Sequence, residues 1–177
     1  MGEDHPVTPD GKERLVRATE LRERGELEDA RALLLELRTE FPDDAHVAVQ
    51  TAWVHDSLGL ELEAVPHYEA AIAGHLSDEE LRGALLGLGS TYRSLGRDAD
   101  SGRTFQAAIE RFPDFPALRV FLALTNYNLG HPREAVADLV RVLVETSSEP
   151  SIVRYRRSLA AYAEDLDRSW LGPPSGS

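Results

Sequence analysis

Apolar residues recur along the chain at intervals of three and four, in short runs that come in pairs separated by a glycine. This spacing places apolar side chains on one face of a helix, so each run predicts an amphipathic α-helix. The separating glycines, Gly25, Gly59, Gly96 and Gly130, lie 34, 37 and 34 residues apart. Because glycine readily adopts the left-handed conformation that ends many helices, the pattern predicts four helix–turn–helix units.

Aligning the chain on these glycines places the units at residues 11–44, 45–78, 82–115 and 116–149. A period of about 34 residues is typical of stacked helical repeats, in which each unit contacts its neighbours. The sequence therefore predicts an all-α solenoid.

The longer middle interval has a local explanation. Ser77 is followed three residues later by Glu80, the spacing of a capping box at a helix start. We therefore expect the third unit to begin with a helix that starts about one turn early.

Beyond the four units, an apolar stripe at residues 150–168 predicts a last helix that caps the array. Residues 1–10 and 171–177 are polar or rich in Gly and Pro, and we expect both segments to be disordered. Residues 11–170 would then form a single domain.

The third unit carries the clearest motif, with large and small residues alternating at fixed positions. Its residues are Leu85, Leu88, Gly89, Tyr92, Gly96, Ser101, Phe105, Ala108, Phe112 and Pro113. This order resembles the tetratricopeptide repeat, and residues 45–145 are similar to a bacterial subgroup known as group 5. The resemblance implies a right-handed superhelix whose first helices line a concave face, where a partner segment binds. It implies no particular partner.

Composition narrows the class of protein further. Cysteine is absent, which excludes disulfides and thiolate metal sites. No run approaches the roughly 18 apolar residues of a membrane span, and residues 1–14 lack the layout of a signal peptide. We therefore expect a soluble, cytoplasmic protein that does not bind membranes.

The net charge of −12 is unevenly distributed along the chain. Residues 1–81 carry 7 basic and 20 acidic side chains. Nucleic-acid binding needs clustered cations, so we do not expect it, and we interpret the small basic cluster at Arg154, Arg156 and Arg157 as a solvated helix face.

Candidate groove residues follow from the equivalent positions of the first helix in each unit. We expect apolar and polar contacts with a partner protein or peptide from Val49, Gln50, Trp53, Asp56, Gly83, Leu86, Gly87, Ser90, Arg93, Val120, Phe121, Leu124, Tyr127 and Asn128. Related domains that grip acidic chaperone tails use lysines and asparagines in slots that here hold Leu15, Thr19, Gln50, Gly83 and Gly87. Docking of acidic tails is therefore not expected.

Two glycines inside one predicted helix need an explanation, because each costs a helix about 1 kcal/mol relative to alanine. Gly83 and Gly87 could leave a recess between Trp53 and Phe121, with Arg93 at one side, for an apolar side chain next to an acidic group. Alternatively, they only allow close packing, for example of a chain terminus or a second subunit.

Two other candidates also have structural interpretations. Asp56 and Arg93 occupy matching positions on neighbouring helices, so they could form an ion pair that sets local geometry. Trp53 could belong to the core or contact a ligand.

The histidines are the candidates for catalysis or metal binding, and their spacing supports neither. Adjacent His55 and Asp56 point to different sides of a helix, whereas a helical metal site needs ligands at i and i+4. We expect His55 to be a packed histidine, and we predict no catalytic residue, metal or cofactor.

The sequence thus predicts a non-catalytic protein interaction module that binds a partner segment in its groove. The alternative is a structural module that self-associates, for example as a homodimer, and binds no foreign ligand.

Overall fold

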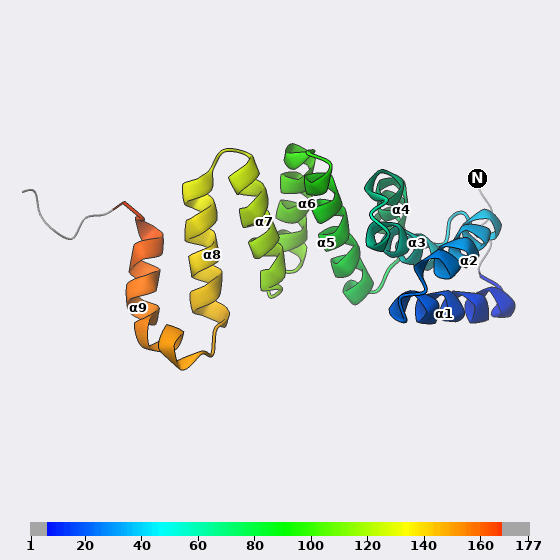
Figure 1. Ribbon diagram of the computed structural model, residues 1–177, viewed down its shortest axis with the longest axis horizontal. Coiled ribbons are helices and arrows are strands. Elements are labelled where there is room, and N and C mark those ends of the chain that lie inside the picture. The colour runs from blue at the N-terminus through cyan, green and yellow to red at the C-terminus, as the bar shows by residue number, and fades with distance from the viewer. Residues whose placement is uncertain (1–6, 168–177) are drawn as a thin grey trace, which may run out of the picture. The chain divides into compact units, whose positions relative to one another are not determined.

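The computed structural model describes residues 7–167, which contain nine α-helices and no β-strand. In chain order the helices are α1 (Pro9–Glu23), α2 (Leu27–Glu40), α3 (Ala45–Ser57), α4 (Glu61–Ala73), α5 (Asp78–Ser94), α6 (Asp98–Arg111), α7 (Pro116–Asn128), α8 (Pro132–Thr146) and α9 (Pro150–Glu164) (Figure 1). The predicted all-α helical repeat is confirmed.

The four predicted glycine turns all form, and they share one hydrogen-bonding pattern. Gly25, Gly59, Gly96 and Gly130 have φ values of 81°, 72°, 71° and 87°. After each first helix, the N–H of the glycine bonds the carbonyl three residues before it, and the next N–H bonds the carbonyl five residues before itself. This pair of bonds is the Schellman motif, which satisfies carbonyls that a helix end would otherwise leave unpaired.

The start of α5 also follows the sequence. Ser77 and Glu80 form the expected capping box, with the Glu80 N–H donating to Ser77 Oγ and the Ser77 N–H donating to Glu80 Oε2. Helix α5 has 17 residues, whereas α3 and α7 have 13 each, so the extra turn lies where it was predicted.

The ends of the array differ from expectation. Helix α1 begins at Pro9, inside the segment expected to be disordered, because Thr8 Oγ1 accepts the Gly11 N–H at 3.1 Å and proline suits the first helical position. Helix α9 ends at Glu164, four residues before the predicted end, at an extended Asp165. Residues 171–177 lie outside the described residues.

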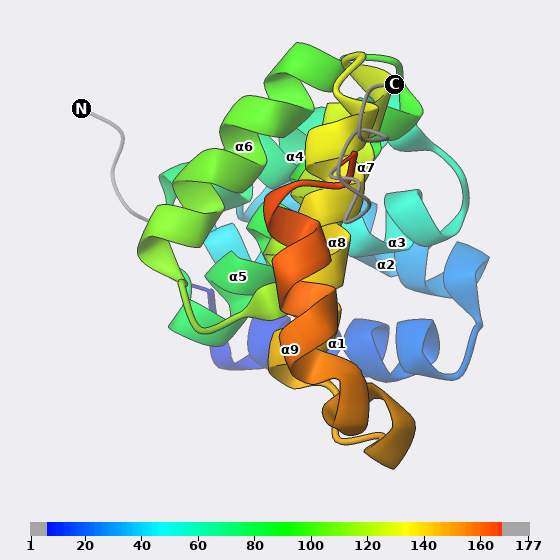
Figure 2. The same cartoon turned by 90° about the vertical axis from the view of Figure 1, so that its left-hand side faces the viewer.

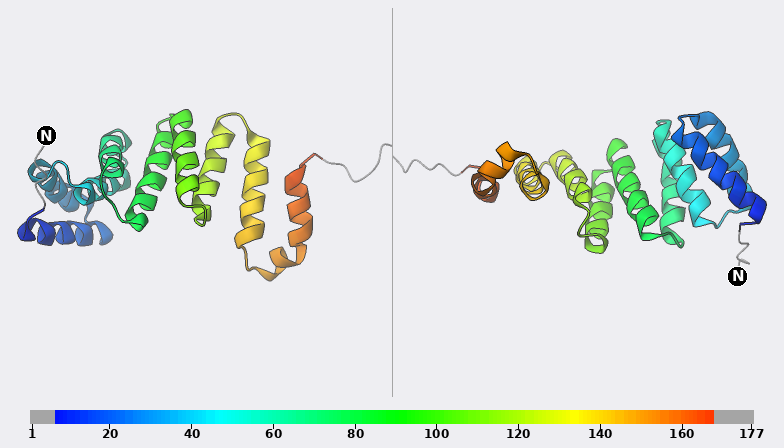
Figure 3. Two further views of the ribbon diagram at one scale, coloured as in Figure 1. Left: turned by 180° about the vertical axis from the view of Figure 1, so that it is seen from behind. Right: turned by 90° about the horizontal axis from the view of Figure 1, so that it is seen from below.

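The chain divides into two compact units where a single domain was expected. The first ends at Phe112 and the second begins at Pro113. In the first unit, each of the helices α1 to α6 packs on its neighbour; in the second, α8 packs against both α7 and α9 (Figures 2 and 3).

Helix α3 is the centre of the first unit. Nine of its 13 residues are buried. Val47 and Val54 belong to an apolar cluster with α1 and α2, whereas Val49 and Ala52 belong to a second cluster with α4 and α5. Because α3 contributes to both clusters, its remaining polar groups must find partners inside the protein.

His55 shows how α3 meets this requirement. Its ring is 2% exposed, and it bonds the Thr51 carbonyl through Nδ1 at 2.7 Å. Arg31 Nε donates to His55 Nε2 at 3.2 Å, so both ring nitrogens of His55 have partners inside the protein. His55 is therefore a packed histidine, and its ring lies 5.1 Å from that of His67.

We predict that His67 makes the stability of the first unit depend on pH. Burial, His55 and Arg38 together lower the pKa of His67 from 6.5 to about 4. Since the unfolded chain then binds the proton more readily, the free energy of unfolding should fall between pH 6.5 and pH 5 through this group, by about 1 kcal/mol because solvent partly screens the half-buried ring. Urea unfolding of the wild type and His67→Gln measures this loss, which the variant should lack. Equal pH slopes in both proteins would contradict the prediction.

Candidate functional site on the surface of α1, α3 and α5

The first helices of the first three repeats lie in order in the first unit, with α3 in contact with both α1 and α5. These three helices carry those predicted groove residues that belong to the first unit. A hollow of about 290 Å³ lies on this surface. It is lined by Leu15, Val16, Thr19, Glu20, His46, Gln50 and Glu80.

One wall of the hollow is apolar and belongs to α1. Leu15 is partly buried against the core, and Val16 is 59% exposed. Thr19 donates its hydroxyl to the Leu15 carbonyl at 3.0 Å, so its polar atom is bonded within its own helix. The wall thus offers apolar area that a ligand side chain could cover.

Gln50 supplies the polar group at the opposite side. Its side chain is 9% exposed, and its Oε1 accepts a hydrogen bond from Arg22 Nε at 3.2 Å. The Arg22 guanidinium in turn lies 5.4 Å from the centre of the Trp53 ring. Because Arg22 holds the carbonyl oxygen, the amide NH₂ is the part of Gln50 that remains available, and no described residue accepts a hydrogen bond from it.

The third side is acidic. His46 Nδ1 lies 2.9 Å from Glu80 Oε1, and Glu80 Oε2 accepts the Ser77 N–H and hydroxyl. Burial raises the pKa of Glu80, but the hydrogen bonds from Ser77 and His46 outweigh it and hold the pKa below its usual value. Glu20 is exposed and pairs with Arg24, which is also exposed, at 3.0 Å.

The predicted site residues of α3 have different environments. Gln50 lines the hollow, and Trp53 is partly buried beneath Arg22. Val49 is fully buried in the apolar cluster with α4 and α5, so it is a core residue instead of a groove contact. The reason is geometric, since neighbouring residues of a helix point about 100° apart.

Asp56 joins three helices. Its carboxylate accepts hydrogen bonds from the Tyr68 hydroxyl at 3.0 Å and the Thr91 hydroxyl at 3.1 Å. Burial and the negative charge of Asp56 raise the pKa of Tyr68, so this phenol stays protonated and donates. The ion pair that we expected between Asp56 and Arg93 stays a prediction. The other candidates on α5 are partly buried: Leu86, Ser90 and Arg93.

The two unexplained glycines of α5 face side chains of the same unit. A Cβ at Gly87 would lie 2.3 Å from the Tyr68 hydroxyl oxygen, and one at Gly83 would lie 3.0 Å from Trp53 Cζ2. Close packing therefore accounts for both, and side chains of α3 and α4 occupy the space that a recess would need. The side chains that pack against these glycines are Trp53 and Tyr68 of the same unit, and not a chain terminus or a second subunit.

The remaining candidates are on α7, in the second unit. Val120, Phe121 and Leu124 are partly buried, whereas Tyr127 and Asn128 are exposed. A groove that includes these residues together with the first unit stays a prediction.

Sequence reasoning missed Glu20, His46 and Glu80 as site residues. The turns at Gly59 and Gly96 are 37 residues apart, whereas His46 and Glu80 are 34 apart, so Glu80 lies three residues earlier in its repeat, in the extra first turn of α5. Aligning the repeats on their glycines therefore did not bring the two residues together.

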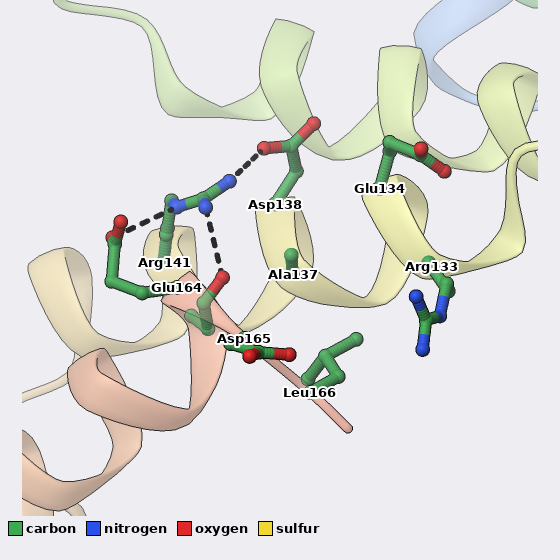
Figure 4. A pocket seen from close by; sticks show the side chains of 9 residues that line it. Arg133, Glu134, Ala137, Asp138, Arg141, Glu164, Asp165 and Leu166 are labelled. Atoms are coloured by element: carbon green, nitrogen blue, oxygen red, sulfur yellow. Dashed lines mark hydrogen bonds and ion pairs between the residues drawn. The ribbon is translucent and has the colours of Figure 1, made fainter. Parts of the chain in front are cut away.

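A second hollow, of about 320 Å³, lies between α8 and the end of α9 (Figure 4). Arg141 crosses it and donates to Asp138 and to the Ala163 carbonyl, both at 2.8 Å, and its Nε lies 3.7 Å from Glu164 (Figure 4). Arg141 thus joins Asp138 of α8 to the end of α9, so we interpret this hollow as part of the contact that attaches α9 to α8.

Other kinds of site find no support in residues 7–167. They contain no group of three or more side chains that could hold a metal ion. Nor does any helix in this range combine the length and hydropathy that crossing a membrane requires.

We predict that Gly87→Ala destabilises the first unit by about 1–2 kcal/mol, because overpacking against the buried Tyr68 outweighs the gain in helix propensity. Gly83→Ala is the matched control, since the partly exposed Trp53 can move aside by a few tenths of an ångström. Urea unfolding measures both. A Gly87→Ala protein as stable as Gly83→Ala would show that α5 does not require the close approach.

Comparison with known proteins agrees with this architecture. No curated protein sequence shows significant similarity. Among solved structures, YrrB, a repeat protein described as having an unusual peptide-binding site, is 18% identical with a TM-score of 0.67, covering 87% of this chain and 78% of YrrB. MamA of AMB-1 is 18% identical with a TM-score of 0.67, covering 83% and 81%. The pilF protein of Pseudomonas aeruginosa is 16% identical with a TM-score of 0.59, covering 86% and 76%.

At these identities the likeness concerns the fold alone. The family model for the "Tetratrico peptide repeat" matches residues 45–166, more than half of the sequence. It extends across α3 to α9, which include three of the four glycine turns. The chain therefore belongs to the tetratricopeptide repeat family.

Proposed function

We propose that this protein is a non-catalytic interaction module that binds an extended segment of a partner protein on the surface of α1, α3 and α5. The Gln50 amide would donate to a backbone carbonyl of the partner, and the hollow would hold one of its side chains. The observation that supports this most directly is the Gln50 NH₂ group, which lies at the hollow without a protein partner.

The energetics favour a polar ligand group at this point. Gln50 is 9% exposed, so a peptide carbonyl that bonds its amide would form a hydrogen bond in a site partly shielded from water, where such a bond is stronger. Arg22 holds the amide in one orientation before binding, so little entropy is lost on contact. The fold agrees, since helical repeats present extended binding surfaces.

The hollow lacks the arrangement that catalysis would need. His46 and Glu80 could exchange a proton, but the one hydroxyl in the lining, on Thr19, is bonded to its own helix. A nucleophile must lie within hydrogen-bond reach of its base. Binding without reaction is therefore the function we infer.

We predict that Gln50→Ala weakens peptide binding about tenfold, the loss of one hydrogen bond in a partly buried site. The probe is a random heptapeptide phage library, selected on the full chain, with the enriched peptides measured by fluorescence polarisation. The matched control is Gln106→Ala, which changes the chain's other glutamine on the exposed face of α6.

Val16→Ser provides a second test at an exposed position, where loss of apolar area should weaken binding without unfolding the chain. Thermal unfolding followed by circular dichroism verifies that all variants fold. Affinities unchanged by both Gln50→Ala and Val16→Ser would contradict the proposed function.

One observation favours self-association as a second candidate. Tyr155 and Tyr162 lie seven residues apart on one face of α9, and they are 56% and 48% exposed. Tyrosines are enriched at protein interfaces because they offer apolar area together with a hydroxyl.

If α9 mediates self-association, the sedimentation coefficient of the wild type should rise with concentration across about 5–200 µM, the range of weak dimers. The Tyr155→Ser/Tyr162→Ser variant should sediment as a monomer throughout. A wild type whose sedimentation does not change with concentration would exclude this second candidate.

A further inference from the structure

The charged side chains around the hollow favour one charge on the ligand, which the apolar wall alone would not do. Its lining includes Glu20 and Glu80 and contains no Lys or Arg. Two arginines lie near the lining: Arg22 is 23% exposed, bonded to Gln50 and 3.9 Å from Glu23, and the exposed Arg24 pairs with Glu20 at the surface. Neither lines the hollow, so the formal charges in its lining are negative.

The surrounding sequence strengthens this field. Residues 41–81 contain nine Asp and Glu residues and no Lys or Arg. Three of these acids, Asp78, Glu79 and Glu80, occupy the first turn of α5, where the helix dipole favours negative charge. Clustered charge of one sign attracts ligands of the opposite sign and speeds their association.

The size of the hollow limits what it can hold. Pockets for drug-sized ligands occupy about 300–1,000 Å³, so a hollow of about 290 Å³ suits a single side chain. Leu15 and Val16 form its apolar wall, and Glu20 and Glu80 flank it. A segment that fills this site needs an apolar residue and a cation close to it in the sequence.

We infer that the partner segment is basic and apolar, with a Lys or Arg within one or two residues of a leucine-sized or aromatic side chain. This rests on the proposed function and adds the chemical class of the ligand. The apolar side chain covers Leu15 and Val16, the cation lies between Glu20 and Glu80, and the Gln50 amide binds the intervening carbonyl. The preference is opposite in sign to a site for acidic tails.

The test continues from the phage selection described above. Sequences enriched on the wild type should combine Lys or Arg with a neighbouring apolar residue. The best sequence is then synthesised in three forms, with its basic residues kept, changed to Gln or changed to Glu. We expect the neutral form to bind several-fold more weakly and the acidic form at least about tenfold more weakly, with the difference shrinking as salt rises from about 50 mM to about 500 mM.

A charge-reversal variant tests the site itself. Glu20→Lys should weaken the basic peptide about tenfold, because it replaces an attraction by a repulsion at an exposed position. Glu110→Lys, on the exposed face of α6, makes the same change in net charge away from the hollow. Its affinity for the basic peptide should stay within about twofold of the wild type. Glu20→Gln is the milder variant should Glu20→Lys fail to fold.

The outcomes separate the two proposals. Enriched peptides that are neutral or acidic, yet still depend on Gln50, would overturn the basic preference and leave the proposed function standing. Equal weakening by Glu20→Lys and Glu110→Lys would also overturn the preference, because the effect would then come from net charge. A library that enriches nothing on the wild type relative to Gln50→Ala would overturn both.

Discussion

The first unit depends on the burial of α3 between two apolar clusters. Val47 and Val54 contact one cluster, whereas Val49 and Ala52 contact the other. A helix enclosed in this way has little surface left on which water can satisfy its polar side chains. Each such group on α3 must therefore form a hydrogen bond inside the protein, or it stays unpaired until a ligand binds.

The polar side chains of α3 follow this rule closely. His55 is bonded by Arg31 and by a backbone carbonyl, and Asp56 accepts hydrogens from Tyr68 and Thr91. Gln50 satisfies its oxygen through Arg22 and has an amide nitrogen left at the hollow. Of these three side chains, Gln50 is the one that keeps a hydrogen-bond donor available for recognition at the hollow.

The glycines show which features a sequence can predict. At the four turns a positive φ is a local requirement, and a Cβ there would meet nothing within 4 Å, so repeat spacing alone located them. Gly83 and Gly87 serve a different purpose, since their neighbours Trp53 and Tyr68 come from other helices. Which side chain fills the space beside a glycine depends on tertiary packing, and a single sequence does not contain that information directly.

The candidate site was predictable to a similar extent. Repeat register selected Gln50, which lines the hollow, but it also assigned Val49 to the groove, although helical geometry turns that residue into the core. The acidic side was missed because Glu80 had been explained completely as a helix cap. In the structure one oxygen of Glu80 caps α5 and the other meets His46, so a residue with a clear local role also shapes the hollow.

The division of the chain into two units bears on how recognition can work. Every contact that shapes the hollow lies within residues 7–112: the bond from Arg22 to Gln50, the capping box of α5, and the pair between His46 and Glu80. Because these contacts form within one unit, the hollow is preorganised without any contribution from α7 to α9. Specificity would then come from the acidic lining and from the one partner side chain that the hollow holds. Affinity could still increase with each further partner residue that contacts the protein.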